Sequence, residues 1–158
     1  MNRLVFSYML NVLLMVLAGW AFIELYYFTI EVANFIQTKR VPFEVSISLI
    51  PLGLLLTFGI VSTVIYKIQK KKYKELSYWM FPLLFPQEDE REKAITEKAC
   101  RTTFMSLWYV LPCAVGFLTL SPIVILYVPA YPIYIAFSIF FIQMTIFHVS
   151  LYRNKIAI

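Results

Sequence analysis

The chain has 158 residues, of which 61% are hydrophobic and 18% aromatic, while only 15% carry a charge. An ordinary soluble domain is about 45–50% apolar and about 25% charged. The excess apolar residues are gathered in long runs, which predicts a membrane protein and leaves no room for a separate globular domain. The net charge of +5 could indicate nucleic-acid binding. However, most basic residues flank apolar runs, where they set membrane orientation, so we expect no nucleic-acid partner.

The first apolar run follows Arg3 and extends from Leu4 to about residue 30. A cleaved secretory signal is the competing interpretation, because Gly19-Trp20-Ala21 loosely resembles a cleavage site. The run is longer than a typical signal core, so we expect an uncleaved spanning helix at residues 4–30.

A short polar connection at residues 31–44 leads to a second predicted span at residues 45–66. Within it, Gly53 with Thr57 and Gly59 with Thr63 place small residues at i, i+4 spacing, which would let another helix approach closely.

A polybasic run follows the second span. Cations near a membrane surface attract anionic lipid headgroups, and aromatic residues settle at the same depth. The predicted headgroup contacts are Lys67, Lys70, Lys71, Lys72, Lys74 and Trp79. A plainer and compatible interpretation is that the run only anchors the second span and fixes its topology.

Two further spans are predicted at residues 104–127 and 133–152, with a tight turn between them. Pro112 and Pro122 in the third span each remove one helix hydrogen bond and favour a kink. The predicted fold is therefore all-α, a single domain over residues 1–158 with four transmembrane helices and a loop at residues 67–103.

The basic residues predict the orientation. All of the fourteen Lys and Arg residues except Lys39 and Arg40 fall near the termini or in the 67–103 loop. The positive-inside rule then predicts a multi-pass protein of the cytoplasmic membrane with both termini in the cytoplasm.

The stretch at residues 87–103 is the one long charged segment, QEDEREKAITEKACRTT. Acidic residues open it and basic residues follow, as favoured at a helix N-terminus. We expect one helix that starts near Glu88, projects about three turns into the cytoplasm and continues into the third span. It is either a solvated extension or a docking face for a partner. The candidate partner-binding residues are Asp89, Glu90, Arg91, Lys93, Glu97 and Lys98.

The run DEREKAITEKA at residues 89–99 resembles a motif of a family of short bacterial and archaeal membrane proteins of unknown function. In that family a similar acidic-Arg element lies between the second and third helices. The resemblance implies a four-helix prokaryotic membrane protein and supplies no activity.

Polar residues inside the predicted spans are few, and ionisable ones are functional candidates by default. The possible intramembrane polar site comprises Glu24, Gln143 and His148. Each also has a plainer role. Glu24 lies near the outer end of its helix and can reach headgroup water, Gln143 could bond between helices, and His148 could be a packing residue.

We expect a non-enzymatic protein without cofactor or metal, because no hydrolytic triad, His-Glu-x-x-His motif or phosphate loop is present. Cys100 and Cys113 lie about 20 Å apart along one helix, too far for a disulfide. The predicted function is binding of a partner membrane protein or membrane-active peptide, in an accessory, regulatory or immunity-type role. The alternative is a small-solute or ion transporter or channel. Lipid and further copies of the chain are the other expected partners.

Overall fold

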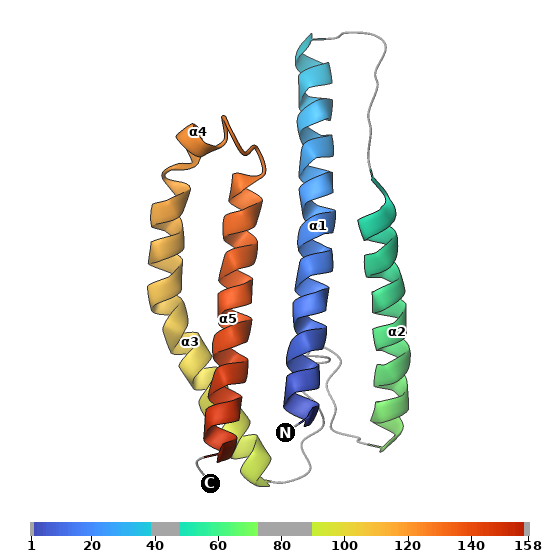
Figure 1. The fold of residues 1–158 in the computed structure, drawn as a ribbon, viewed down its shortest axis with the longest axis vertical. Helices are drawn as coiled ribbons and strands as arrows, with labels where there is room; N and C mark the ends of the chain where they lie inside the picture. Colours follow the sequence, from blue (N-terminus) through green and yellow to red (C-terminus); the bar gives the residue numbers. More distant parts are fainter. Residues whose placement is uncertain (1, 39–47, 73–89, 157–158) are drawn as a thin grey trace.

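A computed structural model describes residues 2–38, 48–72 and 90–156 of the chain (Figure 1). The described part is helical and contains no strand, which confirms the predicted all-α class. Its elements are α1 (Asn2–Thr38), α2 (Ile50–Lys72), α3 (Glu90–Leu118), α4 (Ser121–Val124) and α5 (Tyr131–Ile156).

Three of the described helices are long and apolar enough to cross a membrane, as expected for a membrane protein. Their apolar segments are Leu4–Thr38, Ile50–Ile68 and Tyr131–Ile156. They correspond to the first, second and fourth predicted spans. The apolar part of α3, from Phe104 to Leu118, rises only about 22 Å. The hydrocarbon core of a bilayer is about 30 Å thick, so α3 by itself falls short of that length.

The third span predicted over residues 104–127 is not one helix. α3 ends at Leu118, and the short α4 follows after a turn in which the Leu120 N–H donates to the Phe117 carbonyl at 3.1 Å. Pro122 explains the break, because it has no N–H to donate to the Leu118 carbonyl and its ring would clash with that group. The Tyr131 hydroxyl at the start of α5 also donates to the Phe117 carbonyl, at 2.8 Å, which links the end of α3 to α5.

Two further boundaries differ from the sequence-based prediction. α1 continues to Thr38 through much of the stretch predicted as a polar connection at residues 31–44, because residues 31–38 contain no Gly or Pro. Residues 39–47 lie outside the described part. α2 begins at Ile50 rather than at residue 45, with Pro51 in its first turn, where a proline removes no helix hydrogen bond.

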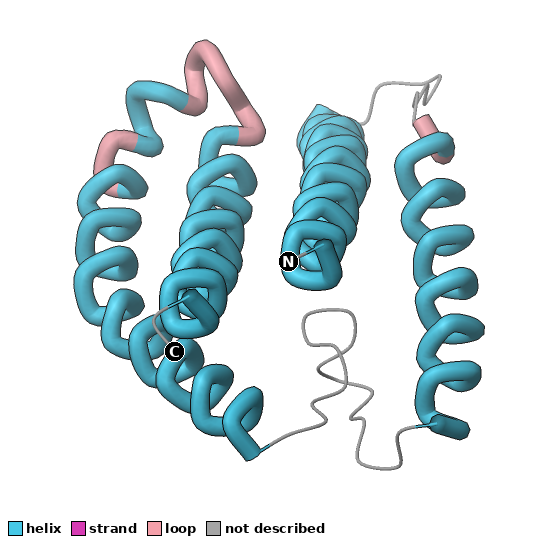
Figure 2. Tube along the Cα trace, turned by 60° about the horizontal axis from the view of Figure 1, so that its bottom comes forward, coloured by secondary structure: helices cyan, strands magenta, loops and turns pink. Residues whose placement is uncertain are grey.

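The long helices stand in an open row in the order α3, α5, α1, α2 (Figures 1 and 2). α5 packs against α3 and α1, and α1 also packs against α2. Successive helices run in opposite directions, so the two termini lie at the same end of the row (Figure 1). The start of α3 and the end of α2 lie at this end too, which we call the termini end.

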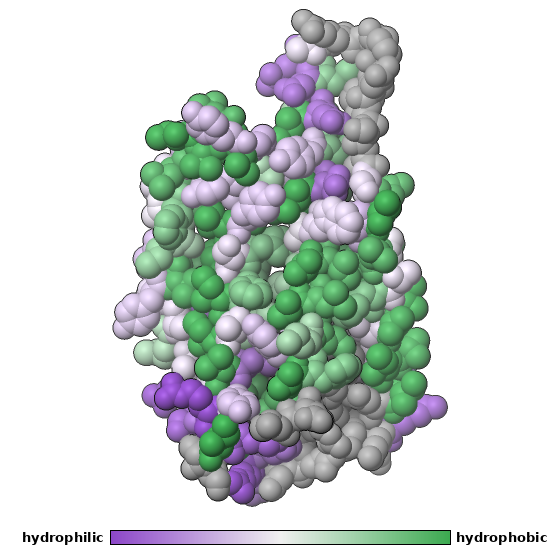
Figure 3. All heavy atoms as spheres, in the orientation of Figure 1, coloured by the Kyte–Doolittle hydropathy of each residue, from purple (hydrophilic) through white to green (hydrophobic). Residues whose placement is uncertain are grey.

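The buried core also lies at the termini end. Phe147 and Leu151 of α5 pack with Ala99 of α3, and the partly buried Leu4 and Ile95 pack against them. Ile95 and Ala99 belong to the charged stretch. Figure 3 shows apolar residues over the middle of the molecule and hydrophilic residues gathered below them at the termini end. The first turns of α3 are therefore packed against the last turns of α5.

Candidate functional site

The first turns of α3 have one face turned inward and one turned outward. Ile95 and Ala99 stand at i, i+4 on the inward face, and Ala99 is completely buried. Among the predicted partner-binding residues, those that the structure describes are all exposed: Glu90, Arg91, Lys93, Glu97 and Lys98. Asp89 lies outside the described residues. We call these five exposed residues the charged face of α3.

An ion pair links this helix to α5. The Lys155 Nζ lies 3.9 Å from the Glu92 Oε1, and both side chains are about half exposed, at 51% and 45%. A pair so accessible to water contributes about 0–1 kcal/mol. The apolar contacts of Ile95 and Ala99, more than this pair, therefore hold the first turns of α3 in place.

The predicted headgroup contacts lie on the last turns of α2. Lys67, Lys70 and Lys71 are exposed there, and the Lys70 Nζ stands 5.5 Å from the centre of the Tyr66 ring. Lys72 ends the helix, and its side chain is not described; Lys74 and Trp79 lie outside the described residues. The exposed cations of α2 and the charged face of α3 share the termini end (Figure 1).

A partly buried polar seam joins α1 to α5. Ser7 and Asn11 of α1 are buried, and the Asn11 Nδ2 donates to the Ser7 carbonyl at 2.9 Å. The Tyr8 hydroxyl lies 3.4 Å from the Thr145 Oγ1 of α5, which is a weak hydrogen bond. His148 completes the seam. We use the name polar seam for these five residues.

His148 is fixed by its own helix and by two rings. Its side chain is only 7% exposed, and its ring centre lies 5.2 Å from that of Tyr8 and 5.4 Å from that of Phe147. The Nδ1 is 2.8 Å from the Met144 carbonyl. Because a carbonyl oxygen only accepts, the hydrogen is on Nδ1. The Nε2 is buried and has no hydrogen-bond partner in the described part of the chain.

Gln143 faces α3 instead of α1. Its Oε1 lies 3.0 Å from the Ser106 Oγ, which also lies 2.7 Å from the Thr103 carbonyl. A hydroxyl has one hydrogen and cannot donate to both oxygens at full strength. With the amide turned over, the Gln143 nitrogen donates to Ser106 while Ser106 donates to Thr103, which satisfies both groups. We assign the amide in that orientation.

The three residues of the predicted intramembrane site lie apart. Glu24 accepts a hydrogen bond from the Trp20 indole at 3.3 Å within α1. It stands about 24 Å along the helix axis from Tyr8, which is the neighbour of His148. Gln143 points to α3 and His148 to α1. Sequence reasoning missed Ser7 and Tyr8, although the i, i+4 spacing of Ser7 and Asn11 on an apolar helix was a usable signal.

The polar seam holds hydroxyl, amide and imidazole groups and no carboxylate. In the described residues, no group of three His, Cys, Asp or Glu side chains is placed to hold a metal ion. The chemistry that the seam can offer is hydrogen bonding and the gain or loss of one proton at His148.

The chain is 32% identical over 139 residues to the "Uncharacterized lipoprotein YgaO" of Bacillus subtilis (strain 168). The alignment covers 88% of this chain and 87% of that protein. No protein-family model matches the chain, and no solved structure matches it. The resemblance carried by residues 89–99 therefore stays a prediction.

Proposed function

The chain belongs to the family of the Bacillus subtilis lipoprotein YgaO, and we propose that this membrane protein is a non-enzymatic binding protein. In this proposal the charged face of α3 binds a partner membrane protein or a membrane-active peptide, and the protein has an accessory, regulatory or immunity-type role. The observation that carries the proposal is the division of α3 into an inward apolar face and an outward charged one. A helix held by α5 presents its charged residues with little loss of freedom on binding.

The proposed topology has four passes, with both termini in the cytoplasm. Support comes from the position of both termini at one end and from the many basic residues there. The short apolar part of α3 is accommodated by local thinning of the bilayer, a modest cost for a helix at the edge of the row. On this topology the charged face of α3 lies at the cytoplasmic surface.

The relative's description as a lipoprotein does not by itself supply a lipid site here. Lipid attachment through a thiol requires a cysteine. The two cysteines of this chain, Cys100 and Cys113, both lie on α3, and both are exposed. The proposed membrane attachment uses the apolar helices α1, α2 and α5.

Charge reversal on the outward face of α3 tests the proposal. We expect Arg91→Glu combined with Lys98→Glu to abolish co-purification of the partner from native membranes, because both residues are exposed and neither belongs to the core. Membrane insertion and the melting temperature should stay the same, since the change leaves Ile95 and Ala99 in place.

A matched variant distinguishes a specific role of the charged face of α3 from a general effect of charge at the termini end. Lys70→Glu combined with Lys71→Glu makes the same change of charge at the same end, but on α2. Partner capture should survive it. Equal loss in both variants would contradict the role of α3. Loss of solute flux in proteoliposomes on Glu24→Gln or Gln143→Leu, with no effect of the α3 changes on capture, would favour the transporter alternative.

A further inference from the structure

The single histidine of the chain sits in the polar seam with one ring nitrogen engaged and the other without a partner in the described residues. The Met144 carbonyl fixes the hydrogen on Nδ1. In a neutral imidazole the Nε2 then carries a lone pair and no hydrogen. The Nε2 of His148 is therefore the atom at which this seam would gain a proton.

The α1 side of the seam offers this nitrogen no counter-charge. Tyr8 is the α1 residue whose ring contacts the imidazole, and the α1 carboxylate nearest to it in sequence, that of Glu24, lies about 24 Å away along the helix axis. Asn11 already donates its amide to the Ser7 carbonyl. The rings of Tyr8 and Phe147 attract a cation weakly, but they accept an N–H hydrogen bond much less well than water does.

Charged groups at this end also come from α5 and α3. On α5 itself, Arg153 and Lys155 in the last turn are cations. On α3, Ile95 and Ala99 pack against the adjacent Phe147, and the carboxylate of Glu92 is paired with Lys155. In the described part of the chain, no carboxylate contacts the imidazole.

We infer that His148 is a proton-operated switch on the contact between α1 and α5. The neutral ring completes the polar seam and lets the two helices pack. Protonation gives Nε2 a hydrogen and a charge, for which the described residues offer no acceptor, and this draws water into the seam and separates α1 from α5 at the termini end. His148 lies in the last turns of α5, so the proton and the water would enter from the termini end.

The first test reads the proton position directly. With one histidine in the chain, ¹⁵N-histidine labelling of the protein in lipid nanodiscs gives one imidazole to follow. We expect the Nδ1–H tautomer near pH 8 and the doubly protonated ring near pH 5. An Nε2–H tautomer near pH 8, or a ring that stays neutral near pH 5, would overturn the inference.

The second test uses a replacement that keeps the hydrogen bond and cannot take a proton. Asn11 and Asn154 each donate to the carbonyl four residues earlier, at 2.9 and 2.8 Å, so Asn at position 148 can donate to Met144 in the same way. On acidification from about pH 8 to pH 5, we expect amide exchange around Ser7 and Asn11 to accelerate about tenfold beyond the intrinsic change. His148→Asn should abolish that acceleration.

A second variant guards against misfolding. His148→Phe keeps an aromatic ring between Tyr8 and Phe147 and also lacks a titratable nitrogen. Loss of the acid response in whichever of the two variants folds supports the switch. An acid response of equal size in the wild type and in either variant, or no response in the wild type, overturns it.

Discussion

At the residue scale, neighbouring polar side chains on α5 serve different helices. Gln143 bonds to Ser106 of α3, while Thr145 and His148 face Tyr8 of α1. Hydrogen bonds between helices in a membrane average only about 0.6 kcal/mol each, because the separated helices also find partners. These bonds therefore specify which sides of the helices meet more than they stabilise the assembly.

A double-mutant cycle measures the interaction energy between Ser106 and Gln143. We expect Ser106→Ala and Gln143→Leu each to lower the free energy of unfolding by about 0.5–1 kcal/mol, with a coupling of about 0.6 kcal/mol between them. The free energy of unfolding is measured in mixed micelles for the wild type, the two single variants and the double variant. Additive single effects would show that the two side chains do not interact. Ser138→Ala is a control, because that hydroxyl donates to the Tyr134 carbonyl of its own helix and bonds to no other helix in the described residues.

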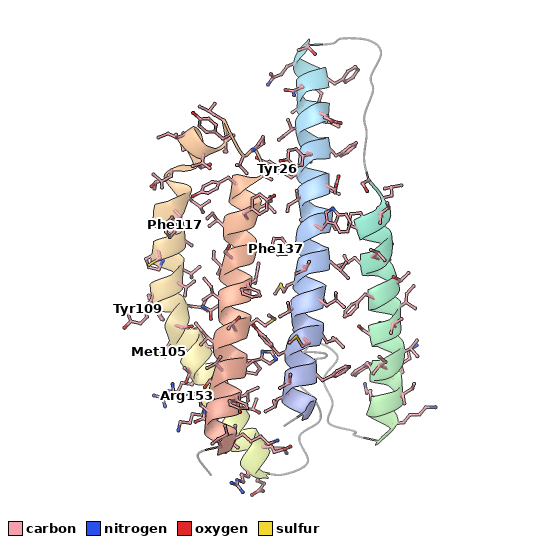
Figure 4. All side chains as sticks on the ribbon, in the orientation of Figure 1. Tyr26, Met105, Tyr109, Phe117, Phe137 and Arg153 are labelled. Carbon is pink, nitrogen blue, oxygen red and sulfur yellow. The ribbon has the colours of Figure 1, made fainter. Side chains whose placement is uncertain are left out.

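At the element scale, the contact between α1 and α5 depends on a small residue facing a large one. Phe137 of α5 lies between the two helices (Figure 4). Its ring packs against Gly19 and stands 5.7 Å, centre to centre, from the ring of Phe22. On the outer side of α3, by contrast, Met105 and Tyr109 point away from α5, and Tyr109 is 76% exposed (Figure 4). The edge helices are thus covered on one side only.

Substitution of Gly19 tests this helix contact. A Cβ added at Gly19 would stand 3.5 Å from the Phe137 ring, which is an ordinary contact, so Gly19→Ala should be neutral or stabilising by up to about 1 kcal/mol. Gly19→Leu should force the ring aside and destabilise by about 1–3 kcal/mol. Gly59 is the control, since nothing lies within 4 Å of its added Cβ in the described residues. A thermal midpoint that falls equally for Gly19→Leu and Gly59→Leu would contradict the contact.

At the scale of the whole molecule, the row of helices has two ends of different character. The termini end has the buried core, the exposed lysines of α2 and the charged face of α3. α1 protrudes at the opposite end, beyond the start of α2 and the start of α5 (Figure 1). Burial is thus concentrated where a cytoplasmic partner would bind in the proposed orientation.

Thiol labelling tests the orientation. Cys100 is exposed on α3 beside the charged face, and Cys113→Ser leaves it as the single thiol. We expect an impermeant maleimide to label Cys100 only after the cells are opened. Labelling in intact cells would contradict the cytoplasmic position of the termini end.

The same thiol has a predictable pH dependence. Partial desolvation by neighbouring atoms raises the pKa of Cys100 above its ordinary value. The thiolate is the reactive form, and a raised pKa means less thiolate at neutral pH. Labelling in opened membranes should therefore be slower than that of a free thiol and should accelerate between about pH 7 and pH 9. A rate equal to that of free cysteine across this range would contradict the desolvation.

The sequence by itself predicted the helical class, most helix positions and the unbroken run from the charged stretch into α3, because apolar length and local charge determine these features. It also indicated Gln143 and His148 as polar residues worth testing. It placed the end of the third span too late, since it took Pro122 for a kink within one helix. Local patterns tell where a helix exists better than where it stops.

Only the tertiary structure decided which helices are neighbours and which side chains meet. α1 and α5 are apolar on nearly all sides, so their sequences do not indicate which side of each helix packs against a neighbour. The order of helices in the row turns His148 towards Tyr8 and Gln143 towards Ser106, and leaves Glu24 beside Trp20. That order depends on close packing between distant parts of the chain, such as Gly19 with Phe137, which no local pattern contains.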